Sequence, residues 1–219
     1  MMQKLIGLML GVSLIFSTAA QANENTLVAL KTDLGTIVIE TYPKSAPKTV
    51  ENFLEYVDSK FYDGTIFHRI VPGFVVQGGG MTFDFAEKET RKPIVNESIN
   101  GLKNDYKSVA MARQSDPDSA TAQFYVNLQN NSGLNATETK PGYTVFGKVV
   151  AGMEVIEKIA KEPTGMFKAY PEAPNYAVRI LSAARINANE LNTLIELQNA
   201  PKPSSFKDAL VPMNEPQQQ

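Results

Sequence analysis

The sequence predicts a mainly β fold, in which an antiparallel, closed sheet carries two helices. The runs of β-branched and aromatic residues are short and are separated by turns rich in Gly, Pro, Asn and Asp. Strands and helices do not alternate in the regular way of a parallel βαβ fold. A chain of 219 residues that is 43% hydrophobic and 20% charged has the composition of a globular domain with a proper core.

The N-terminus has the features of a secretory signal peptide. Lys4 precedes an almost unbroken apolar run over residues 5–16, and Ala20-Gln21-Ala22 fits the small-x-small cleavage pattern. The run is too short to span a membrane comfortably. We therefore expect residues 1–22 to be cleaved, with an uncleaved anchor as the alternative. The protein is then expected in the periplasm, or secreted as the second choice, without stable membrane insertion.

Composition excludes several classes of function. The chain has no Cys and one His, which argues against disulfides, thiol chemistry and a zinc site. Lys and Arg number 21 against 23 Asp and Glu, so the basic excess of a nucleic-acid binder is absent. Asp116 and Asp118 lack EF-hand spacing, and we interpret them as solvated loop charges. We expect no cofactor, no metal and no nucleic-acid partner.

The folded part begins with a hairpin and a helix. Residues 27–32 and 36–41 are β-rich and flank a turn with Gly at its end. Ser45 is expected to cap a helix that ends near Lys60. The apolar residues of this helix recur at helical spacing and predict one buried stripe, formed by Ala46, Val50, Phe53, Leu54 and Val57.

A second hairpin, over residues 67–79, carries the most informative residue of the chain. Two β-rich runs flank the turn Pro72-Gly73. Strict alternation would place Phe67, Arg69 and Val71 on one face and His68 on the other. Since an arginine keeps its charge, we expect its guanidinium to face a cleft beside apolar groups. The alternative is an ordinary hairpin with one surface arginine.

The remaining elements follow in order. Residues 81–107 are polar and irregular, and a proline-containing loop is predicted after Lys161. Further strands are predicted over residues 108–112, 123–128, 142–150 and 176–184, with a helix over 152–161. In the second of these strands Phe124 and Val126 alternate with Gln123 and Tyr125, so we expect a core face and a peptide-gripping polar face. Residues 187–219 form an extension, with a short helix over 189–198 and a flexible tail.

The run Phe67–Gly79, with the sequence FHRIVPGFVVQGG, resembles the signature of the cyclophilins, the peptidyl-prolyl cis–trans isomerases. The resemblance extends over residues 27–186 and includes Met111-Ala112-Arg113 and Ser119–Tyr125. It implies an eight-stranded antiparallel barrel capped by two α-helices, with the active groove on its outer face. The predicted isomerase domain is residues 23–186.

The resemblance also implies roles for individual residues. Arg69 matches the catalytic arginine, and Gln77 matches the glutamine that steadies it. The walls of the proline pocket match Phe74, Val75, Tyr125 and Leu134. The rest of the groove matches Ala112, Arg113, Gln123 and Tyr143. Two positions depart from common family patterns: Arg113 replaces an Asn and looks like the exported bacterial branch, and Gly133 replaces an aromatic residue on which cyclosporin binding depends.

We therefore expect a monomeric prolyl isomerase that acts on X-Pro bonds of exported polypeptides during folding. A non-catalytic binder of Pro-containing segments and a ligand-carrying, lipocalin-like barrel are the alternatives. His68 is interpreted as structural, because alternation places it opposite Arg69. Gly78-Gly79-Gly80 is interpreted as a loop with close backbone approach, since no phosphate-binding pattern follows it.

Overall fold

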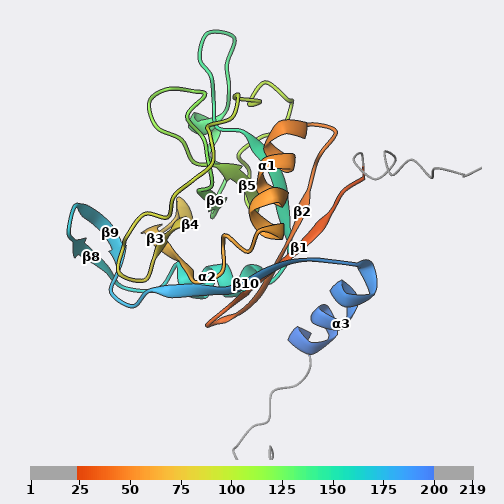
Figure 1. Cartoon of the computed structure of the whole chain (residues 1–219), viewed down its shortest axis with the longest axis vertical. Helices are drawn as coiled ribbons and strands as arrows, with labels where there is room; N and C mark the ends of the chain where they lie inside the picture. Colours follow the sequence, from red (N-terminus) through yellow and green to blue (C-terminus); the bar gives the residue numbers. More distant parts are fainter. Residues whose placement is uncertain (1–23, 200–219) are drawn as a thin grey trace, which may run out of the picture.

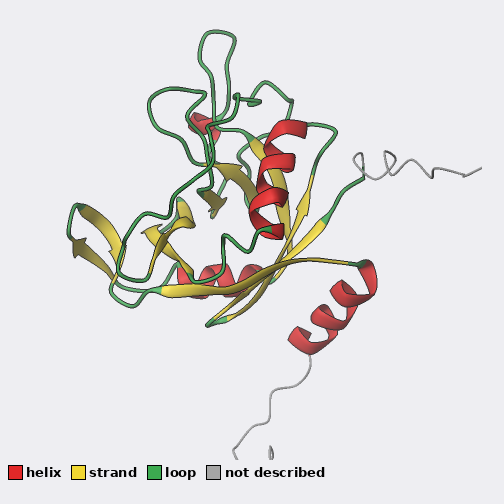
Figure 2. Ribbon diagram, in the orientation of Figure 1, coloured by secondary structure: helices red, strands yellow, loops and turns green. Residues whose placement is uncertain are grey.

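The computed structural model describes residues 24–199, so the predicted signal peptide and the end of the C-terminal extension lie outside it. Its main body is a closed barrel of eight antiparallel strands, which confirms the predicted fold class (Figures 1 and 2). In their order around the barrel the strands are β1 (Leu27–Thr32), β10 (Val178–Ile186), β3 (Thr65–Val71), β4 (Val75–Thr82), β6 (Phe124–Asn127), β5 (Ser108–Met111), β7 (Val145–Ala151) and β2 (Gly35–Thr41).

The barrel interior and two helices share one apolar core. Helix α1 (Pro47–Asp58) contributes Phe53, and α2 (Met153–Ile159) contributes Ile156. The ring of Phe53 lies 5.9 Å from that of Phe124 and 5.0 Å from that of Phe146, and all three side chains are fully buried. Aromatic side chains therefore fill the interior, which argues against the lipocalin-like alternative.

The start of α1 differs from the prediction. The residue before the helix is Ala46, and no side chain of the preceding segment caps it. Instead, the carboxylate of Glu97 accepts hydrogen bonds from the backbone N–H groups of Lys48 (3.0 Å) and Thr49 (2.8 Å). The prediction that Ser45 caps this helix is therefore wrong. An anion from a distant loop satisfies the free N–H groups and the positive end of the helix dipole.

Strand β3 also departs from the expected pattern, because its pairing with β4 is irregular between Phe67 and Arg69. Phe67 pairs with Gly78 and Arg69 with Gln77, which leaves His68 as the extra residue of a β-bulge. Phe67 and Ile70 are consequently both buried in the barrel core. The prediction that Phe67 and Arg69 share a face is wrong, since only Arg69 is directed outward.

A two-stranded hairpin, β8 (Thr164–Phe167) and β9 (Tyr170–Pro174), replaces part of the predicted proline-containing loop. Pro171 and Pro174 disfavour a strand in the sequence, yet proline is tolerated in short edge strands such as these. Ala173 packs with Ile66 and Phe85 in a second apolar cluster outside the barrel. The hairpin, which projects to the left in Figure 1, is thereby fixed against the outer surface of β3.

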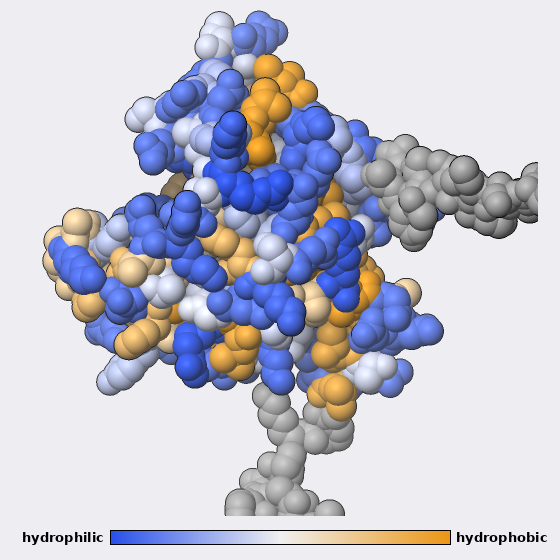
Figure 3. Space-filling model, viewed as in Figure 1, coloured by the Kyte–Doolittle hydropathy of each residue, from blue (hydrophilic) through white to orange (hydrophobic). Residues whose placement is uncertain are grey.

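After β10 the chain forms α3 (Ala188–Asn199), which the sequence predicted within a residue or two. This helix has no buried residue, and Gln198 Nε2 donates to the Thr36 carbonyl at 2.9 Å. Hydrophilic residues dominate the face of the molecule in Figure 3, with apolar residues in small groups. Among residues 24–199, no helix combines the length and the apolar character that crossing a membrane requires.

Candidate active site

The residues selected from the sequence converge on the outer face of the barrel. A pocket of about 240 Å³ is lined by Arg69, Phe74, Val75, Gln77, Ala112, Arg113, Tyr125, Leu134 and Tyr143. Gln123 lines an adjoining depression together with Ala112 and Arg113. The structure thus brings all ten predicted residues into one continuous region, although they come from β3, β4, β6 and the loops between strands.

The pocket has its own apolar cluster, separate from the barrel core. Val75 and Tyr125 are buried at its base, with Phe74 and Leu134 packed against them. The alternation predicted for β6 is confirmed, because Phe124 and Val126 face the core while Tyr125 faces this pocket. Ala110 and Leu102 belong to the same cluster and were not selected from the sequence. Ala110 lies in a strand of four residues and Leu102 in an irregular segment, so neither has a periodic pattern around it that predicts which way its side chain faces.

Arg69 supplies the positive charge at one end of the pocket. Its Nε donates to Glu172 Oε2 at 2.6 Å, and its Nη1 lies 3.4 Å from Gln77 Oε1. Gln77 Nε2 in turn donates to Gln123 Oε1 at 2.9 Å. The guanidinium is therefore held on two edges while its side chain stays 36% exposed. Sequence reasoning missed Glu172, which is 103 positions away on the unpredicted hairpin.

The glycine run on β4 makes room for this polar chain. A Cβ atom on Gly80 would lie 2.4 Å from Cγ of Gln123, far inside contact distance. Gly79 has a φ of +84° and lies against Phe124, where a side chain would also clash. The interpretation of this run as a loop is wrong, because all three glycines lie within β4. The close backbone approach expected of them is confirmed, since it seats Gln123 beside Gln77.

A buried asparagine joins the walls of the pocket. Asn104, which is 1% exposed, accepts a hydrogen bond from the Tyr125 hydroxyl at 2.8 Å. Its Nδ2 lies 3.3 Å from the carbonyl oxygens of both Leu134 and Tyr143. Burial raises the pKa of Tyr125, so the phenol remains a protonated donor. No local pattern pointed to Asn104, which lies in the irregular segment before β5.

Two further asparagines extend this network to the opposite wall. Asn127 Nδ2 lies 3.2 Å from Asn104 Oδ1, and Asn131 Nδ2 donates to Asn127 Oδ1 at 2.7 Å. Asn131 Nδ2 also donates to the Phe74 carbonyl at 3.0 Å. Asn104, Asn127 and Asn131 together form what we call the asparagine network, which connects each aromatic wall of the pocket to the barrel.

Arg113 lies at the rim of the pocket rather than in its base. Its guanidinium carbon is 4.5 Å from the centroid of the Tyr143 ring, a cation–π contact. Nη1 donates to the Gln114 carbonyl at 2.8 Å, and Nη2 to the Pro141 carbonyl at 3.3 Å. These contacts hold the rim loop and one face of Tyr143.

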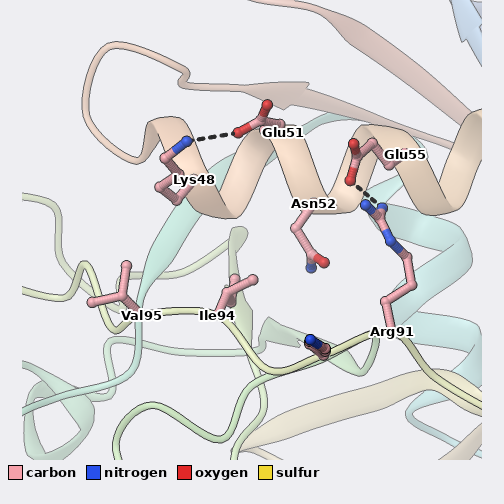
Figure 4. Close-up of a pocket in the computed structure, with 8 residues that line it drawn as sticks. Lys48, Glu51, Asn52, Glu55, Arg91, Ile94 and Val95 are labelled. Carbon is pink, nitrogen blue, oxygen red and sulfur yellow. Dashed lines mark hydrogen bonds and ion pairs between the residues drawn. The ribbon is translucent and has the colours of Figure 1, made fainter.

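A larger groove of about 590 Å³ lies between α1 and the segment around Arg91–Val95 (Figure 4). Four of its charged residues form two ion pairs, Lys48 with Glu51 at 3.1 Å and Arg91 with Glu55, and Lys92 also lines the groove. Asn52 points into the groove and donates to the Thr121 carbonyl. Ile94 and Val95 are the only apolar residues among the eight that line this groove, whereas the pocket at Arg69 has aromatic walls beside its guanidinium.

Comparisons with known proteins identify the family of this chain. The sequence profile described as "Cyclophilin type peptidyl-prolyl cis-trans isomerase/CLD" matches residues 27–185. A peptidyl-prolyl cis-trans isomerase of Acinetobacter baylyi is 46% identical over 192 residues, which cover 88% of this chain and 99% of the relative. Peptidyl-prolyl cis-trans isomerase B of Escherichia coli is 45% identical over 159 residues, covering 71% of this chain and 97% of that protein.

The fold comparison leads to the same group. A cyclophilin-type isomerase of Cryptosporidium parvum, solved in the presence of the dipeptide Ala-Pro, superposes with a TM-score of 0.61 and 25% identity. The alignment covers 74% of this chain and 99% of that structure. Barrel, pocket and sequence thus define an enzyme that isomerises peptidyl-prolyl bonds. The chain belongs to the cyclophilin-type peptidyl-prolyl cis–trans isomerases.

Proposed function

We propose that this isomerase accelerates X-Pro isomerisation in exported polypeptides as they fold, and that Arg69 is its catalytic residue. One observation carries the proposal: an arginine held on two edges, by Gln77 and Glu172, lines the same pocket as apolar and aromatic walls. In this proposal the apolar walls receive the proline ring, and the guanidinium donates a hydrogen bond to its imide nitrogen.

The chemistry needs only hydrogen bonding and shape. Rotation about the X-Pro bond is slow, with a barrier of roughly 20 kcal/mol, because conjugation is lost at the twisted geometry. In that geometry the proline nitrogen becomes pyramidal and regains a lone pair. A fixed guanidinium then hydrogen-bonds the transition state more strongly than the planar ground state, and such differential binding raises the rate.

The other residues hold the substrate while the bond turns. Phe74, Tyr125 and Leu134 enclose the ring, and the amides of Gln77 and Gln123 are available to the backbone before proline. The Cryptosporidium parvum structure was solved in the presence of Ala-Pro, which supports the same class of ligand here. We propose peptide segments with X-Pro bonds as substrates and a monomer as the working form.

The cellular role rests on the sequence. The apolar leader and the Ala20-Gln21-Ala22 pattern support export, with the periplasm as the proposed location. An exported isomerase would meet polypeptides that fold after crossing the membrane, when slow proline steps limit the rate.

The experiment compares catalysis with binding. Residues 23–219 are purified and mixed with a peptide containing one X-Pro bond, and exchange between its cis and trans forms is followed by NMR. We expect exchange to accelerate in proportion to enzyme concentration. The binder alternative predicts resonance shifts on binding without acceleration, and that outcome would reject catalysis. Slow refolding phases of an exported protein with cis prolines should also shorten.

A further inference from the structure

We propose that Glu172 is a positioning residue for Arg69, and that the β8–β9 hairpin therefore belongs to the active site. The inference rests on the proposed catalytic role of Arg69. It identifies what orients the guanidinium from the side opposite Gln77. It also gives a function to a hairpin that lies outside the barrel.

The hairpin is anchored independently of the ion pair. Ala173, next to Glu172 in β9, is 1% exposed and packs with Ile66 of β3. The ring of Phe85 lies 4.6 Å from that of Phe167 and 5.7 Å from that of Tyr170, so both strands of the hairpin are held. Because β9 lies along β3 and side chains alternate along a strand, the packing of Ala173 fixes the direction of its neighbour Glu172.

The geometry at Arg69 needs two anchors. A guanidinium is a rigid plane on a chain with four rotatable bonds, and a single contact leaves it free to pivot. Glu172 Oε2 accepts from Nε at 2.6 Å, while the contact from Nη1 to Gln77 Oε1 is longer, at 3.4 Å. The shorter, charge-assisted bond is the stronger of the two. Among the described residues no protein acceptor occupies Nη2, which leaves that group for the substrate.

Two opposing effects decide whether Glu172 raises or lowers the rate of catalysis by Arg69. The carboxylate of Glu172 weakens the positive field that the guanidinium exerts at the proline nitrogen. The same carboxylate holds the guanidinium in place, so that its N–H groups stay aligned with that nitrogen. Both side chains are partly exposed, at 36% and 40%, so water screens the charge effect and the pair adds little to stability. Misplacement of a catalytic donor is costly even when small. Positioning therefore outweighs the loss of field, and Glu172 favours catalysis.

The test uses single substitutions of the full mature chain. Glu172→Ala should lower kcat about three- to tenfold, the range for releasing one long side chain, with KM nearly unchanged because Arg69 acts on the transition state. Glu172→Gln keeps an acceptor and should retain more activity than Glu172→Ala. Glu89→Ala removes an exposed charge after β4 and is the matched control. The melting temperature should change little in all three.

A second arm connects the effect to Arg69. Lysine lacks the Nε–H group to which Glu172 binds. In an Arg69→Lys background, Glu172→Ala should therefore lower kcat less than twofold. In wild type the Nε–Hε signal of Arg69 should be observable by NMR and protected from exchange, and Glu172→Ala should abolish that protection. Unchanged or increased kcat in Glu172→Ala, or an equal loss in both backgrounds, would overturn the positioning role. Full activity of Arg69→Lys and Arg69→Ala would instead remove the proposed function itself.

Discussion

The hydroxyl of Tyr125 donates a hydrogen bond of 2.8 Å to the side-chain oxygen of Asn104, a residue that is almost completely buried. Asn104 also reaches the backbone carbonyls of Leu134 and Tyr143. One carboxamide thus connects three walls of a pocket that come from distant parts of the chain. The apolar surface of the pocket is therefore shaped by a polar network behind it.

Asn104→Ala is the direct test of this network. Leaving a buried partner unsatisfied costs roughly 1–3 kcal/mol, so we expect a fall of this size in the free energy of unfolding, measured in urea. We also expect KM for an X-Pro peptide to rise more than kcat falls, because the walls bind the ring. Tyr125→Phe keeps the ring and removes one donor, and should show a smaller version of both effects. A stable Asn104→Ala protein with unchanged KM would contradict the structural role given to the network.

The buried histidine makes stability depend on pH. Burial lowers the pKa of His68 from 6.5 to about 4, against the smaller effects of hydrogen bonds with the Ile66 backbone and the Gln123 side chain. Between these values the unfolded state binds a proton that the native state does not. Stability should therefore fall as pH drops from about 6.5 to about 4, by about 3 kcal/mol in total.

Urea unfolding at several pH values between 4 and 7 measures this slope. Replacing His68 with Gln, which cannot titrate, should flatten the dependence in this window. Activity of the wild-type protein near pH 7 should be nearly independent of pH, because His68 is already neutral and Arg69 stays charged. An equal slope in His68→Gln would assign the pH dependence to other groups.

The cap of α1 offers a matched pair of substitutions. Glu97→Ala removes the acceptor of two backbone N–H groups at the helix start and should lower the free energy of unfolding by about 1–2 kcal/mol. Ser45→Ala should change it by less than about 0.5 kcal/mol, since the helix is not capped by Ser45. Thermal or urea unfolding of the two variants distinguishes them. A larger effect of Ser45→Ala would restore the prediction made from the sequence.

We predict weak cyclosporin binding, because the resemblance to the cyclophilins implies an aromatic residue at the position where this chain has Gly133. No atom lies within 4 Å of the position that a Cβ would take on Gly133, so a larger residue fits there. Gly133→Trp should tighten cyclosporin binding by about tenfold or more, since burying an aromatic side chain contributes roughly 2 kcal/mol. Isothermal titration calorimetry measures the change in affinity. Equal cyclosporin affinities of the wild type and Gly133→Trp would contradict the prediction that the missing aromatic residue weakens binding.

The sequence predicted the parts of the site that depend on local pattern. Alternation over Gln123–Leu128 correctly placed Tyr125 outside the core, and the signature run placed Arg69 beside Gln77. It failed where pairing departs from strict alternation, as at the bulge of His68, which separates Phe67 from Arg69. Periodicity assumes one residue per position in the ladder, so a bulge cannot be read from it.

Long-range contacts account for the other failures. Glu97 caps a helix 48 positions away, and Glu172 reaches Arg69 across 103 positions. Asn104 lies in an irregular segment whose polar residues look like ordinary loop material. In each case the role of the residue is decided by what the tertiary fold places next to it, and no local propensity records that neighbour.

The most direct measurement is the effect of Arg69→Ala on kcat/KM for a single X-Pro peptide in a protease-coupled assay. Arg185→Ala removes an exposed arginine of β10 that pairs with Asp58 of α1 and does not line the pocket, and it is the matched control. Circular dichroism verifies that both variants fold. Losing a transition-state donor should lower kcat/KM about 100-fold or more in Arg69→Ala and leave the control unchanged. Wild-type kcat/KM in a folded Arg69→Ala protein would contradict the catalytic role of this arginine.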